Sequence, residues 1–292
     1  AITVNTAAVA VDVSATTDVE EVYVDGVGAT SVTLAADQSV TLANDAVANT
    51  VVNVAATETS TTVTLDNIVT ADSVTLVGAA NTSFTVAGSV AGAGATTLTV
   101  NAAASTTTLN IDLSSDTALT ITGAALTSID ASASDGDLTI TGTATVTSIL
   151  GGAGADIIAE GAAGVAVNGN AGQDDITLDG TVASVVTVDA GESGITLATM
   201  DVITGFVSGT DDLEFGLAAG SATNTVVDNT AGGLLDAVTN ANTAFAADDA
   251  LLYVISDVGA DTYVIVDTDG DHDADTAVLL SGTAAATFAD IV

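Results

Sequence analysis

The chain has 292 residues, contains no lysine or arginine, and carries 38 aspartate and glutamate residues, for a formal net charge of −38 at pH 7. The lack of basic side chains excludes the basic patches that bind nucleic acid or anionic membranes. Hydrophobic residues make up 48% of the chain, which excludes an acidic disordered tail, and the absence of cysteine excludes disulfides and thiolate metal sites. So large a charge opposes a compact state, and we therefore expect external cations to offset it.

The apolar stretches are too short for membrane insertion. Thr and Asp interrupt each of them, and none approaches the roughly 18 apolar residues of a membrane helix. The start of the chain has no basic, apolar signal sequence, so we expect secretion without a cleaved N-terminal signal peptide.

The first half of the chain alternates β-branched or apolar residues with small polar ones. Residues 31–34, 39–42 and 73–76 all read Ser-Val-Thr-Leu. This period of two predicts half-buried strands with Val and Leu on one face and Ser and Thr on the other.

A repeat appears between residues 95 and 150. The segment 118–123 recurs with small changes at 137–142, and Thr127-Ser128-Ile129 recurs at 147–149. Short strands that return at intervals of roughly 20 residues predict the coils of a β-solenoid. Residues 1–94 repeat less regularly, so both a β-sandwich and β-solenoid coils are open there.

The predicted fold class is all-β in four regions. Residues 1–94 form the Thr/Val-rich β region, 95–150 the solenoid repeats, 151–200 a short parallel β-roll, and 201–292 a β-rich C-terminal cap. One helix is expected, near 233–247. Its predicted apolar face holds Leu234, Leu235, Val238, Ala241 and Phe245.

A glycine-rich nonapeptide follows the repeats. Residues 151–159, Gly-Gly-Ala-Gly-Ala-Asp-Ile-Ile-Ala, fit the pattern G-G-x-G-x-D-x-U-x at every specified position. Glycines let a turn expose its carbonyls to an ion, and the Asp adds a carboxylate. Ca²⁺ takes six to eight oxygen ligands in flexible geometry, which two stacked turns can supply.

The register of the motif strengthens the calcium prediction. Residues 169–177 repeat it two nonapeptides later with Asn170 in place of a glycine, whereas 160–168 hold Val165 where the Asp should be. Glu192 is an acid at the same interval beyond Asp174, without the glycines. The predicted inter-coil ligands are Gly151, Ala153, Asp156, Gly169, Ala171 and Asp174, with Glu192 as a weaker candidate. The alternative is a glycine-rich turn with solvated aspartates.

This nonapeptide resembles the repeats-in-toxin family, whose members are exported by type I secretion. Residues 201–215 are similar to the segment that follows the repeats in serralysin-type C-terminal domains, D-x-I-x-D-F-x-x-G-x-D-x-I, although Gly205 replaces an Asp. The resemblance implies that residues 151–200 are a calcium-binding β-roll and that 201–292 are a serralysin-like C-terminal domain with the secretion signal. It also makes Asp201 and Asp211 candidate ligands. The alternative is a turn in which these aspartates cap backbone N–H groups.

An aspartate-rich loop lies between two apolar stretches near the end of the chain. Asp267, Asp269, Asp271 and Asp275 have the 1, 3, 5, 9 offsets of a calcium loop, and Asp273 is expected to offer its backbone carbonyl. Glycine occupies position four rather than six, so the loop is not an EF-hand. A solvated acidic hairpin is the alternative, and His272 is expected to be an exposed loop residue.

The motifs argue against catalysis. There is no H-E-x-x-H motif and only one histidine. A Ser-His-Asp triad would therefore have to use His272, which lies inside an acidic loop. The composition is similar to that of bacterial surface-layer proteins: acidic, free of cysteine and rich in Thr, Ala and Val.

We therefore expect a non-enzymatic, calcium-dependent structural protein at the outer cell surface. Its expected partners are Ca²⁺ and further copies of itself, with a cell-surface polysaccharide as a further candidate. The alternatives are an extracellular fibre or adhesin fragment, and a calcium-binding carrier domain of a secreted enzyme.

Overall fold

The computed structural model describes residues 1–5, 10–16, 19–25, 31–43, 50–69, 72–91, 96–162, 164–283 and 286–292. The chain divides into two compact units, Ala1–Ala153 and Gly154–Val292.

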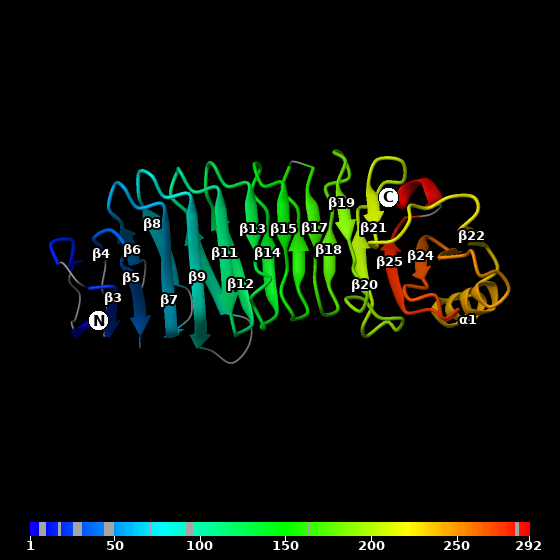
Figure 1. Cartoon of the computed structure of the whole chain (residues 1–292), viewed down its shortest axis with the longest axis horizontal. Helices are drawn as coiled ribbons and strands as arrows, with labels where there is room; N and C mark the ends of the chain where they lie inside the picture. Colours follow the sequence, from blue (N-terminus) through cyan, green and yellow to red (C-terminus); the bar gives the residue numbers. More distant parts are fainter. Residues whose placement is uncertain are drawn as a thin grey trace. The chain divides into compact units, whose positions relative to one another are not determined.

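The N-terminal unit is a parallel β-solenoid with two sheets (Figure 1). Odd-numbered strands pair in chain order to form what we call the odd sheet: β1 (Ile2–Asn5), β3 (Glu21–Asp25), β5 (Ser39–Ala43), β7 (Ser60–Val69), β9 (Ser83–Ala91), β11 (Thr108–Leu113), β13 (Ser128–Asp130) and β15 (Ser148–Leu150). Even-numbered strands form the even sheet: β2 (Ala10–Asp12), β4 (Ser31–Thr33), β6 (Thr50–Asn53), β8 (Asp72–Val77), β10 (Thr96–Asn101), β12 (Thr117–Thr122) and β14 (Leu138–Thr141).

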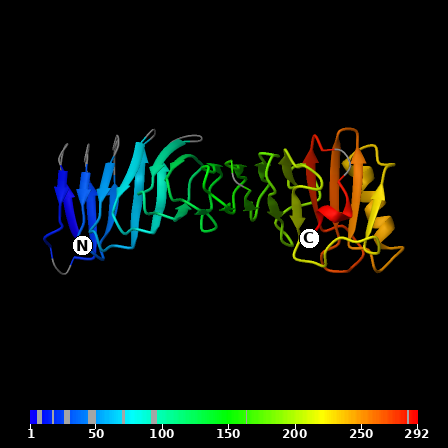
Figure 2. The ribbon, with the colours of Figure 1, turned by 90° about the horizontal axis from the view of Figure 1, so that it is seen from above.

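Each strand pairs in parallel with the equivalent strand of the next coil, as the side-by-side strands of this unit show in Figure 2. Of the two alternatives for residues 1–94, the solenoid is therefore correct and the sandwich is not. The predicted alternation is also confirmed, because Val40, Val63 and Val86 pair in register and are fully buried. Such columns of apolar residues form the core between the two sheets.

The sequence repeats predict the pairing register only in part. Ser128 pairs with Ser148 and Ile129 with Ile149, as the Thr-Ser-Ile repeat predicts. The other repeat does not set the register, since Thr117 rather than Leu119 pairs with Leu138. A shift of two residues leaves every side chain on its own face, so burial of the apolar residues does not select between the two registers.

The C-terminal unit begins with shorter coils. One sheet holds β17 (Ala166–Asn168), β19 (Val185–Thr187) and β21 (Asp212–Glu214). The other runs in the order β16 (Ile157–Ala159), β18 (Asp175–Thr177), β20 (Asp201–Thr204), β25 (Thr276–Ser281), β24 (Asp261–Val266), β23 (Tyr253–Val258) and β22 (Thr225–Asp228). Strand β24 is antiparallel to both of its neighbours, β23 and β25, so the last part of this sheet is no longer solenoidal.

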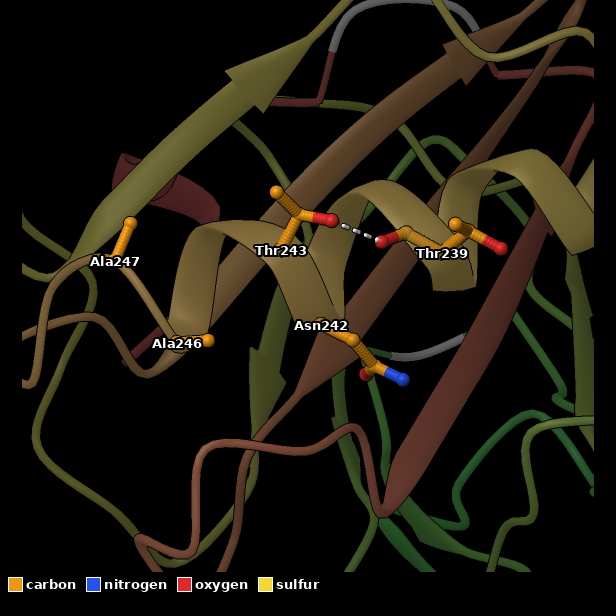
Figure 3. A pocket seen from close by; sticks show the side chains of 5 residues that line it. All are labelled: Thr239, Asn242, Thr243, Ala246 and Ala247. Carbon is orange, nitrogen blue, oxygen red and sulfur yellow. Dashed lines mark hydrogen bonds between the residues drawn. The ribbon is translucent and has the colours of Figure 1, made fainter.

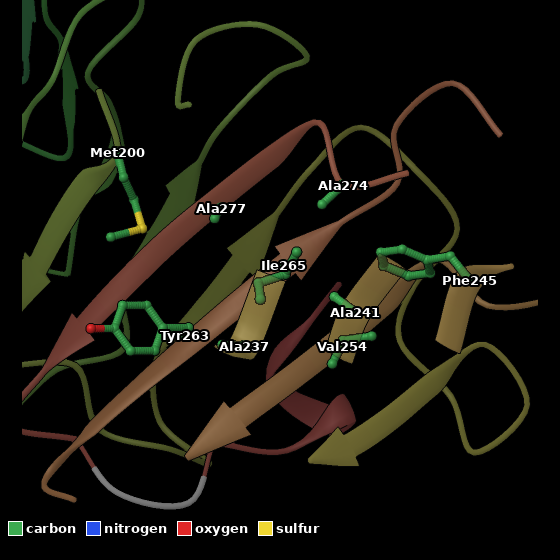
Figure 4. Packing of buried hydrophobic residues seen from close by; sticks show 9 residues of the cluster. All are labelled: Met200, Ala237, Ala241, Phe245, Val254, Tyr263, Ile265, Ala274 and Ala277. Carbon is green, nitrogen blue, oxygen red and sulfur yellow. The ribbon is translucent and has the colours of Figure 1, made fainter. Parts of the chain in front are cut away.

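Helix α1 (Leu234–Phe245) packs against β22, β23 and β24, and η1 (Phe288–Asp290) is a short 3₁₀ helix. Figure 4 shows the core beneath α1, which comprises Met200, Ala237, Ala241, Phe245, Val254, Tyr263, Ile265, Ala274 and Ala277. The helix and most of its apolar face match the prediction. The prediction that Leu235 is buried is wrong, however, because its side chain is 80% exposed. Ala237, which was not predicted, is buried in the core instead. No helix in the described residues is long and apolar enough to cross a membrane.

Candidate metal centre

The loop between β24 and β25 brings four carboxylates together. Asp267, Asp269, Asp271 and Asp275 each place one carboxylate oxygen within 4.8 Å of those of the others. These are the four side chains that the 1, 3, 5, 9 spacing selects. Asp273 contributes no carboxylate to the cluster, in keeping with the expectation that only its backbone would take part.

Hydrogen bonds from the loop's own backbone orient these carboxylates. Asp267 accepts from the N–H groups of Gly270, at 2.7 Å, and His272, at 3.1 Å. Asp275 accepts from the N–H and hydroxyl of Thr268 at 2.8 and 2.9 Å. Gly270 and His272 have φ angles of 78° and 74°, so the chain coils tightly around the cluster.

The loop is anchored to the core at both ends. Asp267 is 1% exposed, and its N–H donates to the carbonyl of Leu252. The N–H of Asp275 donates to Val266, and that of Ala274 donates to the side-chain oxygen of Asn242 on α1 at 2.8 Å. The cluster is thus anchored at Asp267 and Asp275, whereas Asp269 and Asp271 are exposed to solvent.

Asn242 also lines an open surface depression beside α1 (Figure 3). The other lining residues are Thr239, Thr243, Ala246 and Ala247, and the Thr243 hydroxyl donates to the Thr239 carbonyl. None of these five lining residues has an ionisable side chain.

His272 behaves as expected of an exposed loop residue. Its side chain is 42% exposed, and its Nε2 lies 3.8 Å from a carboxylate oxygen of Asp249. It takes part in the loop through its backbone N–H.

A second acidic group lies inside the coils of the C-terminal unit. The N–H of Asp156 donates to Oδ1 of Asp174 at 2.8 Å, and the N–H of Asp174 donates to Oδ1 of Asp201 at 2.9 Å. All three aspartates are at most 2% exposed. The predicted stacking of Asp156 on Asp174 is therefore present, and Asp201 extends the stack by one coil.

This aspartate stack leaves a buried oxygen without a partner. Oδ2 of Asp174 has no hydrogen-bond partner in the described structure. Burial, together with the charges of Asp201, Asp156 and Glu192, raises the pKa of Asp174 to about 8. Burial and the charge of Glu192 raise the pKa of Asp201 to about 7. A buried acidic group of this kind is stable when it holds a proton or a cation.

Glu192 is not in register with the stack, which is a correction to the prediction from the motif interval. Asp175 pairs with Val202, so the residue that follows Asp174 in the stack is Asp201, 27 residues on. The last coil is longer because residues 189–200 form a turn, and Glu192 accepts from the N–H of Asp189 within it. Its influence on the stack is electrostatic.

The motif glycines allow this close approach. A Cβ on Gly169 would overlap Oδ2 of Asp174, and a Cβ on Gly172 would overlap the carbonyl oxygen of Gly154. Asn170 has a φ of 61°, a left-handed conformation that Asn tolerates, which explains why it can replace a glycine. Ala171 lies in the same turn. Gly151 and Ala153 belong to the N-terminal unit, and their part in ion binding stays a prediction.

Asp211 lies on the other side of the coils. Its carboxylate accepts from the N–H of Ser184 at 2.9 Å and from that of Val207 at 2.8 Å. These contacts are those of the N–H-capping alternative, and a metal role for Asp211 stays a prediction. Gly205, where the serralysin pattern has Asp, has a φ of 84° and no room for a Cβ, which would overlap the Leu178 carbonyl.

Sequence reasoning missed one buried acid. Asp290 is 1% exposed, and its carboxylate accepts from Gly209, Ser208 and Thr287. The Thr-x-x-Asp spacing of a capping box at residues 287–290 was the available signal.

The fold and site define a parallel β-solenoid with buried aspartates in its coils and an acidic cluster that could hold a metal ion. The chain matches no protein-family model and no curated protein.

Proposed function

We propose that the chain is a secreted structural protein that folds on binding Ca²⁺ and then self-assembles at the cell surface. The observation that carries this proposal is the group of four carboxylates in the loop 267–275, in a chain without lysine or arginine. No lysine or arginine can neutralise the group, and a cation from the solvent can.

The donor set favours a hard divalent cation. Carboxylate and carbonyl oxygens suit Ca²⁺, whereas the softer metals prefer thiolate and imidazole ligands. The repeats-in-toxin resemblance of residues 151–177 supports the same ion for the aspartate stack. There, a cation would serve the unpartnered oxygen of Asp174 and offset the charge that burial disfavours.

The difference in Ca²⁺ concentration between the cytosol and the outside of the cell would then determine where the chain folds. Extracellular calcium modules bind on the order of 10⁻⁴–10⁻³ M, far above the free Ca²⁺ of a cytosol. The chain would leave the cell unfolded and gain its acidic fold outside. Binding to the folded state alone stabilises it by about 1.4 kcal/mol per site when the ion is at ten times its Kd.

The first test is Ca²⁺ binding by the whole chain, measured by calorimetry. The double variant Asp269→Asn/Asp271→Asn should lose one binding site or weaken it at least tenfold. Asp273→Asn is the matched control, because it removes an acid from the same loop outside the cluster, and it should bind within about twofold of the parent. Equal Ca²⁺ binding by all three proteins would show that the loop 267–275 is not a calcium site.

The second test is assembly. With millimolar Ca²⁺ the purified chain should scatter light above a threshold concentration, and electron micrographs should show two-dimensional sheets. Filaments instead of sheets would favour the fibre or adhesin alternative. A chain that stays monomeric at every concentration would favour the carrier-domain alternative and contradict the proposal.

A further inference from the structure

The two sheets of the N-terminal unit carry different charge on their outer faces. On the odd sheet, outward positions hold the acids Glu21, Asp25, Asp66, Asp112 and Asp130, all exposed or half-buried. On the even sheet from β4 to β14, the described outward side chains that are exposed or half-buried are all uncharged: Ser31, Thr33, Val51, Asn53, Thr75, Val77, Thr97, Thr99, Asn101, Ala118, Thr120, Thr122, Thr139 and Thr141. We call this second surface the neutral face.

Most side chains of the neutral face carry a hydroxyl or an amide, and Val51, Val77 and Ala118 are the apolar exceptions. Thr99 pairs with Thr120, and Asn101 pairs with Thr122 in the next row. Side-chain hydrogen bonds fix this row, because Asn101 donates to Thr75 at 2.9 Å and Thr122 donates to Asn101 at 2.7 Å. Side chains already held in place lose little conformational entropy when a partner docks on them.

We propose that the neutral face is the surface through which two copies of this chain contact each other. This inference rests on the proposed self-assembly and names its interface. Each copy has a formal charge of −38 and no Lys or Arg, so neither residue type of one copy can complement an acidic surface of another. Contact through the odd sheet would bring acids of both copies together, and like charges that face each other across an interface cost several kcal/mol.

The neutral face avoids this repulsion. A twofold contact would place the same Thr and Asn rows of both copies opposite each other, where hydroxyls and amides can donate and accept in turn. Asp116 and Asp137 precede β12 and β14 at the rim of the face, where solvent screens them.

The size of the face predicts a weak contact. Strands about 4.8 Å apart place β4 and β14 roughly 24 Å from each other, and three alternate residues span about 13 Å of each strand. The contact therefore covers on the order of 400 Å² per copy, below the roughly 800 Å² of a standard interface. Such a contact suits a lattice, in which many weak contacts act together, better than an isolated dimer.

The test adds the same charge to each sheet in turn. Thr99→Asp/Thr120→Asp places two acids on the neutral face, and Thr62→Asp/Thr85→Asp places two on the odd sheet, where the two threonines are also register partners. We expect the neutral-face variant to raise the threshold concentration for calcium-dependent assembly at least tenfold, and the odd-sheet variant to raise it less than threefold. Equal effects, or a larger effect of the odd-sheet variant, would overturn the inference. Circular dichroism confirms that both variants fold.

A second readout separates this inference from the proposed function. The chain has no cysteine, so Thr120→Cys and Thr85→Cys each introduce a single thiol for a short bis-maleimide crosslinker. We expect crosslinked dimers from Thr120→Cys and at least tenfold fewer from Thr85→Cys. Dimers from Thr120→Cys without any higher assembly would contradict the proposed function and leave the contact standing. The absence of a preference between the two variants would overturn the contact itself.

Discussion

The two units differ in the side chains that accept hydrogen bonds from backbone N–H groups of a neighbouring coil. For N–H groups away from solvent, the N-terminal unit uses serine hydroxyls of the next coil: Ser134 accepts from Leu113 at 2.9 Å and Ser115 accepts from Val90 at 3.0 Å. Its carboxylates accept between coils at exposed positions, as Glu58 does from Asp37.

The C-terminal unit uses the carboxylates of Asp174, Asp201 and Asp211 at three such contacts. It keeps a serine at a fourth, where Ser184 accepts from the N–H of Val165 at 3.2 Å. If the proposed function is correct, the N-terminal unit folds at any calcium level and the fold of the C-terminal unit depends on protons and cations.

The acidic residues are also distributed differently between the two units. The sequence places 15 acids in residues 1–150 and 23 in residues 151–292. In the first unit, the acids whose side chains are described lie on outer surfaces and in turns. In the second unit, six acids are buried: Asp156, Asp174, Asp201, Asp211, Asp267 and Asp290. The net charge thus has two roles: a solvated surface in one unit and, on the proposed function, a calcium-dependent interior in the other.

The largest expected effect comes from the apolar core, which should not depend on calcium. Leu109 is fully buried on β11, and Leu109→Ala should lower the free energy of unfolding by about 2–5 kcal/mol. Because Leu109 packs among apolar side chains, the loss should be the same with Ca²⁺ and with chelator. Urea unfolding followed by circular dichroism measures it. A loss that appears only with chelator would erase the distinction between the units.

Turn glycines of the acidic coils should have the next largest effect. Gly172→Ala combines a φ of 143° with a Cβ that would overlap a backbone carbonyl. We expect a loss of about 2–4 kcal/mol from strain and overpacking. Gly191→Ala is the matched control: its φ is 86°, but nothing lies within 4 Å of the added carbon, so strain alone should cost about 1–2 kcal/mol. Thermal unfolding with Ca²⁺ present tests the pair, and equal losses would show that the close approach of the two coils is not needed.

A smaller effect concerns pH. Burial raises the folded-state pKa of Asp174 from its ordinary value of 3.8 to about 8 and that of Asp201 to about 7. At a pH between the ordinary pKa of 3.8 and the raised folded-state pKa, the folded state binds more protons than the unfolded state. The metal-free protein should therefore lose stability as pH rises from about 4 to about 8. Added Ca²⁺ should reverse that loss, because the carboxylates then face a cation.

Asp174→Asn tests this pH dependence directly. The amide keeps an acceptor for the Asp156 N–H and cannot ionise, so the metal-free variant should be more stable than the parent at pH 8, by about 1–3 kcal/mol, with a flatter pH profile. Ser134→Ala, at the equivalent contact of the other unit, should cost about 1 kcal/mol at every pH. A steep pH profile that survives Asp174→Asn would assign the titration to other groups.

Local patterns predicted most of the fold. Period-two alternation predicted the strands and their buried faces, since Val and Leu are mostly buried on one side of each strand. The interval between the two glycine-rich motifs predicted the Asp156–Asp174 contact, because two nonapeptides make one coil. The 1, 3, 5, 9 spacing selected the four carboxylates of the loop.

The remaining features depended on coil length, which no local pattern sets. The coil from Asp174 to Asp201 spans 27 residues, as does the one from Ser184 to Asp211. Asp201, rather than the predicted Glu192, therefore lies next to Asp174 in the following coil. The two 27-residue intervals are equal because each coil contributes one strand to each sheet, and the sequence alone does not show this. In the same way, Leu235 and Ala237 lie on opposite flanks of the apolar stripe of α1, and only the packing of α1 on the sheet decides which of them is buried.

Hydrogen exchange of the intact chain, with Ca²⁺ and with chelator, tests the central claim most directly. Mass spectrometry of proteolytic fragments reports residues 1–153 and 154–292 separately. We predict that chelation removes protection from the amides of the coils and loop in 154–292 by at least tenfold and leaves those of β3 to β13 protected. Protection that is unchanged in 154–292, or that falls equally in both units, would contradict a calcium-dependent acidic unit joined to a calcium-independent one.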